Sequence, residues 1–182
     1  MRAVLTKRLI PAIDTIGRGL AYIAMAMMTV MIAVMLYEVA ARKLFSAPTL
    51  WANDITYMIN GSLFLIGAAF TLRMNAHVRI DFLSTQLPLR AQHAVNLLFY
   101  IGIVLPGLYM VGSAAATKAW KAFRTDEIEA MSAWEPLIWP FFSGIAIGLV
   151  GLFIQVVGEA LRHGIGIADP AAVRPPSETE QI

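Results

Sequence analysis

Apolar residues form four long blocks along the chain, separated by short polar connections. The blocks run over about 16–37, 55–72, 94–116 and 137–158. A helix needs about 20 apolar residues to cross the hydrocarbon core of a bilayer. In lipid each peptide group also needs a hydrogen-bond partner inside the protein, which a helix supplies. The pattern therefore predicts an all-α integral membrane protein with four transmembrane helices.

The polar segments define the rest of the domain organisation. Residues 1–166 are expected to form a single four-helix membrane domain, and residues 167–182, rich in proline, alanine and glutamate, a disordered tail. Segment 45–51 is expected to lie in the membrane interface, and segment 81–87 to form a short interfacial helix.

The first block has a second interpretation, as a signal peptide that is removed. Its basic leader is long, its apolar run exceeds a normal signal-peptide core, and no clear small-residue cleavage site follows. These features favour a retained transmembrane helix.

Lysine and arginine placement predicts the orientation in the membrane, because cytoplasmic loops carry the excess of these residues. With four spans both termini lie on one side, together with Arg2, Lys7, Arg8, Arg18, Arg73, Arg79, Arg90, Arg162 and Arg174. The other side holds Arg42, Lys43, Lys118, Lys121 and Arg124, and it also holds all four tryptophans. Both termini are therefore expected in the cytoplasm.

Composition and the absence of known motifs argue against several classes of function. Only 14% of residues are charged and 58% are hydrophobic, whereas about 25% charge is usual in soluble domains. The absence of cysteine removes disulfides and thiolate chemistry, and a net charge of +2 gives no reason to expect nucleic-acid binding. No zinc-protease, phosphate-loop, nucleophile-elbow or dinucleotide motif is present. We expect no enzyme activity and no resident cofactor.

Small residues line one side of the fourth block. Gly144, Gly148, Gly151 and Gln155 follow one another at alternating spacings of four and three, so they share one face of a helix. Small residues let a second backbone approach closely, which drives helix association in lipid. This row predicts a protein contact, either within the four-helix domain or with a partner subunit.

Polar residues inside the blocks are few. Glu38 and Arg42 are one helical turn apart, which favours an ion pair within the helix. Asn60 and Gln155 lie deepest in the predicted membrane region, where such side chains usually hold helices together. Glu159 and Arg162 are expected to lie at a solvated helix end.

Two further functions remain possible at this level. His93 and His163 are both expected near the cytoplasmic side, so a haem clamped between helices is one alternative. A stand-alone small carrier is the other, although carriers usually show repeats and broken helices that the sequence lacks. Four simple helices with small-residue faces fit a scaffold better.

Residues between the first and third blocks carry a resemblance to a known family. The pattern is Glu38, Arg42, Phe45-Ser46, Trp51, Asp54, Gly67-Ala68-Ala69, Arg73, His77, Arg79-Ile80-Asp81, Leu83 and Leu87-Pro88. It resembles the DctQ-like small membrane subunit of tripartite ATP-independent periplasmic (TRAP) transporters. The chain departs from that family at Asp54, where glutamate is usual.

The resemblance implies a helper subunit in the bacterial inner membrane. Its partners would be a large membrane subunit, which binds substrate and sodium and moves them by an elevator motion, and a periplasmic binding protein, which delivers an organic acid. The sodium ion would therefore be bound by the large subunit and not by this chain.

The same resemblance gives the motif residues structural or interface roles. Trp51 and Asp54 would hold the outer connection, and Arg73, His77 and Asp81 would organise the cytoplasmic loop near membrane lipids. The alternative for each is an ordinary anchor at the membrane edge.

Overall fold

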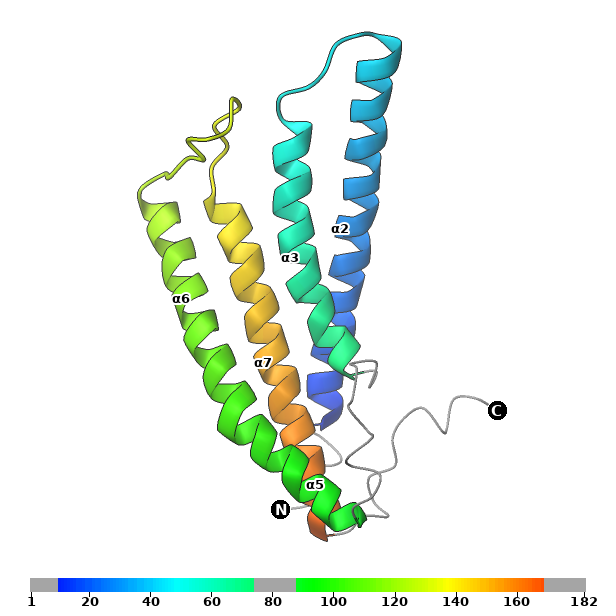
Figure 1. The fold of residues 1–182 in the computed structure, drawn as a ribbon, viewed down its shortest axis with the longest axis vertical. Helices are drawn as coiled ribbons and strands as arrows, with labels where there is room; N and C mark the ends of the chain where they lie inside the picture. The colour runs from blue at the N-terminus through cyan, green and yellow to red at the C-terminus, as the bar shows by residue number, and fades with distance from the viewer. Residues whose placement is uncertain (1–9, 74–87, 169–182) are drawn as a thin grey trace, which may run out of the picture.

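The computed structural model describes residues 10–73 and 88–168, and all regular structure in these two ranges is helical (Figure 1). In chain order the elements are α2 (Ile10–Leu44), α3 (Ala52–Arg73), α5 (Leu89–Phe99), the π-helix η2 (Tyr100–Val104), α6 (Leu105–Arg124) and α7 (Trp139–Ala168). In four stretches these helices are long and apolar enough to cross a membrane: Ile10–Leu44, Ala52–Leu72, Arg90–Arg124 and Trp139–Ile167. The prediction of four spanning helices is confirmed, and each is longer than its apolar block.

Local sequence explains where α2 ends. At its described start, Pro11 lies in the first turn, where its missing N–H costs nothing. Arg42 and Lys43 lie in the last turn, where positive charge complements the carbonyl end of the helix. Ser46 then takes a φ of 53°, and Pro48 prevents the helix from continuing. The chain crosses to α3 through residues 45–51 without forming a helix.

The third span is a bent helix with a widened turn. It starts after Pro88, an extended residue whose carbonyl accepts a hydrogen bond from the Ala91 amide. It passes through the π-helical turn Tyr100–Val104 and continues as α6, with Pro106 in its first turn. Proline has no N–H to donate, so a change of helical register near it is expected. Figure 1 shows the helix curving where α5 passes into α6.

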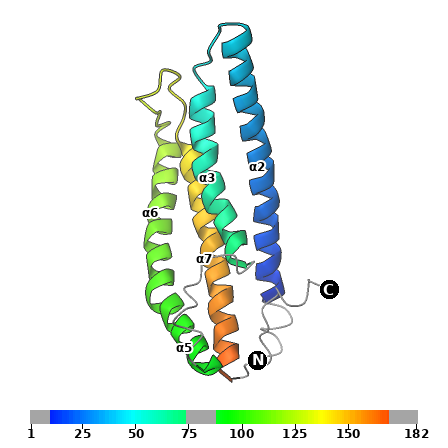
Figure 2. The same cartoon turned by 45° about the vertical axis from the view of Figure 1, so that its right-hand side comes forward.

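The helices stand side by side in the order α2, α3, α7, α6 (Figures 1 and 2). The main contacts are α2 with α3, α3 with α7, and α7 with α6, and a smaller contact joins α2 to α7. A small core of Leu20 and Ala24 from α2 with Ile66 and Ala69 from α3 fills the first of these contacts. We call the end with Ile10 and Ala168 the terminal end, and the end with the connections 45–51 and 125–138 the loop end.

Candidate functional site: the helix contacts of α7 and the two ends of the row

The glycine row of α7 faces the neighbouring helices of the same chain. A Cβ atom added at Gly148 would lie 2.8 Å from backbone atoms of Leu65 and Ile66 in α3. At Gly144 it would meet the Ser62 side chain, also on α3. These two glycines therefore allow contacts with α3 that a methyl group would block. Of the two interpretations of the row, this geometry favours contact within the domain.

The row continues toward the terminal end, where α2 takes the place of α3. A Cβ at Gly151 would collide with the Leu20 side chain of α2, and one at Gly158 would lie 3.1 Å from Ile13. Gln155, between them, is 1% exposed. Its amide nitrogen makes a long, 3.5 Å hydrogen bond to Asp14 of α2.

A largely buried ionic cluster joins α2 and α7 at the terminal end. Arg162 donates through Nη2 to both carboxylate oxygens of Asp14, at 2.7 Å each, and through Nη1 to Glu159 Oε1 at 2.7 Å. The side chains of Arg162, Asp14 and Glu159 are 15%, 18% and 5% exposed. The interpretation of Glu159 and Arg162 as a solvated helix end is wrong, because Asp14 of the distant α2 packs over them.

A histidine pair joins α5 to α7 beside this cluster. The Nδ1 atoms of His93 and His163 are 2.9 Å apart, a hydrogen-bond distance. Tyr100, the first residue of the π-helical turn, stacks on His163 with ring centroids 5.7 Å apart. Gly166 lies against the His93 ring, since an added Cβ would come within 2.8 Å of it.

This geometry does not fit the haem alternative. Metal–imidazole bonds of about 2 Å would hold two axial nitrogens roughly 4 Å apart. Here the two rings face each other through Nδ1 atoms 2.9 Å apart, which is a hydrogen bond and not the spacing of two axial ligands. The pair here connects the start of the third span to the end of the fourth.

At the loop end, Glu38 holds the connection between α2 and α3. Its Oε1 accepts hydrogen bonds from Arg42 Nη2 at 2.6 Å and Nε at 3.1 Å, which confirms the expected ion pair. Its Oε2 accepts from the Thr49 backbone N–H at 3.0 Å and from the Thr49 hydroxyl. Trp51 stacks on Tyr37 with ring centroids 5.7 Å apart. The buried carboxylate thus ties the end of α2 to the connection that leads into α3.

Asp54 fastens the second loop-end connection to α3. The Ser132 hydroxyl donates to Asp54 Oδ2, although the two residues are far apart in sequence. Within the connection, an isolated bridge pairs Ile128 with Leu137, and Lys118 of α6 forms an ion pair with Glu127 at 2.6 Å. The third span extends to Arg124, and these contacts show that the connection after it is folded.

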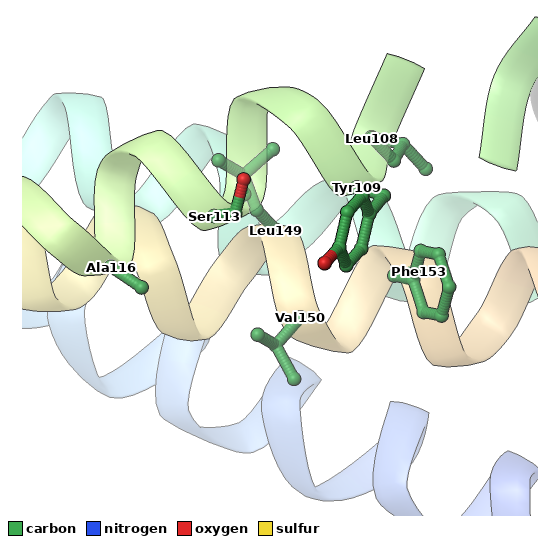
Figure 3. A pocket seen from close by; sticks show the side chains of 8 residues that line it. Leu108, Tyr109, Ser113, Ala116, Leu149, Val150 and Phe153 are labelled. Atoms are coloured by element: carbon green, nitrogen blue, oxygen red, sulfur yellow. The ribbon is translucent and has the colours of Figure 1, made fainter. Parts of the chain in front are cut away.

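An open groove of about 220 Å³ lies between α6 and α7 (Figure 3). Tyr109 of α6 and Phe153 of α7 lie next to each other along it in Figure 3. The groove is lined by Leu108, Tyr109, Gly112, Ser113, Ala116, Leu149, Val150 and Phe153, none of which carries a charge. Such a surface suits hydrocarbon and offers a carboxylate ligand no cation.

The cytoplasmic-loop residues of the motif are only partly described. Arg73 is the last residue of α3, and its side chain lies outside the described part of the chain. His77, Asp81 and the expected interfacial helix at 81–87 also lie outside the described residues. The tail expected from residue 167 begins inside α7, which ends at Ala168. The roles of these residues stay predictions.

Comparison with known proteins gives two matches. A family model described as the DctQ component of tripartite ATP-independent periplasmic transporters matches residues 31–164. The sialic acid TRAP transporter small permease protein SiaQ of Vibrio cholerae serotype O1 is 25% identical over 161 residues, which cover 87% of this chain and 91% of that protein. The family match includes α3, the whole third span and most of α7, and begins within α2.

Proposed function

The chain belongs to the DctQ family of TRAP transporter components, and from this we propose that it is a scaffold subunit that packs against the large transport subunit. Family membership makes it a multi-pass inner-membrane component of a transporter and not an enzyme. The observation that carries the proposal is the family match across residues 31–164, which reaches all four spanning segments.

The distribution of charge supports a scaffold over a carrier. In the described spans the charged side chains lie toward the helix ends, with Asp14, Glu159 and Arg162 at the terminal end and Glu38 and Arg42 at the loop end. Each of these carboxylates is already paired with an arginine. Ions and charged solutes crossing a bilayer need polar ligands near its middle. Substrate and sodium are therefore assigned to the large subunit.

The proposed system takes up organic acids. A periplasmic binding protein captures the substrate, and the large subunit moves it together with sodium while the small subunit stays fixed. The SiaQ relative belongs to a sialic acid transporter, and sialic acid is an organic acid, so it is the first substrate to test. Both termini are assigned to the cytoplasm from the lysine and arginine distribution.

Reconstitution tests this function. A large TRAP subunit from the same organism and its binding protein are placed in liposomes with an inward sodium gradient, with and without this chain. We expect sialic acid uptake only from the complete set. Uptake by this chain alone, or equal uptake without it, contradicts the proposal.

A further inference from the structure

One amide in the middle of α3 points away from the rest of the chain. Asn60 lies eight residues after Ala52 and twelve before Leu72 in the second span, or about 12 Å and about 18 Å from its ends at 1.5 Å per residue. Its side chain is exposed and makes no hydrogen bond to any described residue. An amide at this depth that faces hydrocarbon loses its hydrogen bonds with water and gains none in return.

Three hydroxyl side chains on the spans do not share this problem. Thr29 donates to the Met25 carbonyl at 3.0 Å, and Thr71 to the Gly67 carbonyl at 3.0 Å. Ser113 of α6 donates to the Met110 carbonyl at 2.9 Å. Short hydroxyl side chains reach their own helix backbone in this way and can then face lipid. The surface around Asn60 therefore differs chemically from the surfaces around these hydroxyl side chains.

Neighbouring residues make this a continuous open surface. Tyr57 and Phe64 lie on the same side of α3 as Asn60, by helical spacing, and they are 68% and 76% exposed. Gly67, one further turn along, has nothing within 4 Å of an added Cβ. We call Tyr57, Asn60, Phe64 and Gly67 the Asn60 face. The opposite side of α3, with Ser62, Ile66 and Ala69, is buried against the neighbouring helices.

We propose that the Asn60 face receives a membrane-spanning helix of the large subunit, and that the Asn60 amide hydrogen-bonds with a polar group on that helix. This inference rests on the proposed function. The glycine row of α7, the other candidate docking surface, is already filled by α3 and α2. An amide calls for a partner that can both donate and accept hydrogen bonds, which lipid chains cannot do. The open space at Gly67 lets the incoming backbone come close.

Photocrosslinking tests the location of this contact. A photoreactive benzoyl-phenylalanine replaces Phe64 on the Asn60 face, and in a matched control it replaces Met110 on α6, which is 71% exposed. Both variants are expressed with the large subunit and illuminated in membranes. We expect a crosslink to the large subunit from position 64 and none from position 110. A crosslink from 64 to a second copy of this chain, to lipid only, or equal crosslinks from both positions overturns the proposal.

Substitution of Asn60 tests the chemistry. Asn60→Leu is expected to lower the affinity for the large subunit about three- to tenfold, the usual range for a hydrogen bond between membrane helices. The thermal stability of the isolated chain should not fall. Asn60→Gln should retain most of the affinity, and Ser113→Ala, which removes a hydroxyl bonded within its own helix, should retain all of it.

The results separate this inference from the proposed function. If wild-type chain and large subunit do not co-purify, the scaffold function is wrong and the docking face falls with it. If they co-purify and Asn60→Leu binds as well as wild type, the scaffold function stands and the Asn60 face is wrong.

Discussion

Arg162 of α7 holds both carboxylate oxygens of Asp14 at 2.7 Å, and so joins the first and last spanning helices at the terminal end. Arg162 also neutralises Glu159, so one cation serves two carboxylates. A buried ion pair contributes little net stability, but removing one partner is costly because the other stays buried without compensation.

Substitution of Arg162 should destabilise the chain more than substitution of Asp14. Arg162→Gln leaves the buried Glu159 and the partly buried Asp14 together without a cation, and is expected to lower the free energy of unfolding by about 3 kcal/mol. Asp14→Asn leaves Arg162 paired with Glu159 and should cost about 2 kcal/mol. Thermal unfolding of the detergent-solubilised chain measures both, and Arg18→Gln, at an exposed position of α2, is the control. Equal losses from the two substitutions would contradict the shared role of Arg162.

Contact between α7 and α3 makes Gly148 intolerant of a methyl group. Gly148→Ala places its Cβ 2.8 Å from the α3 backbone, so the helices must separate, at an expected cost of about 1–3 kcal/mol. Gly19→Ala is the matched control, because nothing lies within 4 Å of a Cβ there. That control should be neutral or stabilising by up to about 1 kcal/mol. The prediction fails if both variants unfold at the wild-type temperature.

Glu38 should control the order of the connection between α2 and α3. Glu38→Gln removes the charge that holds Thr49 and Arg42, so amide hydrogen exchange should become faster at Thr49 and its neighbours in 45–51. Lys43→Gln changes an exposed charge in the last turn of α2 and should leave exchange unchanged. Unaltered exchange in Glu38→Gln would show that other contacts order the connection.

Single cysteines test the proposed orientation, because the natural chain has none. Met131, in the loop-end connection, is 97% exposed, and Ala12 is exposed at the terminal end. A membrane-impermeant maleimide added to intact spheroplasts should label Met131→Cys, and it should label Ala12→Cys only after the membrane is permeabilised. The reverse pattern would place both termini in the periplasm.

Sequence predicted the parts of this structure that depend on local pattern. Four apolar blocks indicated four spanning helices, and the spacing of Gly144, Gly148 and Gly151 indicated a contact surface. The pattern did not identify which helix fills that surface, because a glycine row records only how closely a backbone can approach. The Glu38–Arg42 pair was predictable for the same local reason, as its partners are one turn apart.

Other features depend on contacts between distant parts of the chain. Glu159 and Arg162 resemble a solvated helix end until Asp14, 148 residues before Arg162, is placed beside them. The sequence predicts that Asn60 holds helices together, and only the packed structure shows that it faces away from the other described helices. The π-helical turn at Tyr100–Val104 has no simple sequence signal apart from the nearby Pro106.

Because α2, α3, α7 and α6 stand in a row, the domain has the shape of a plate (Figures 1 and 2). With about 8–10 Å between neighbouring helix axes, the plate measures about 24–30 Å from its first axis to its last. A plate this wide meets more viscous drag in the bilayer than a round bundle of equal mass. Fixed to one side of a larger protein, it would widen that protein within the bilayer and resist its tilting and rotation.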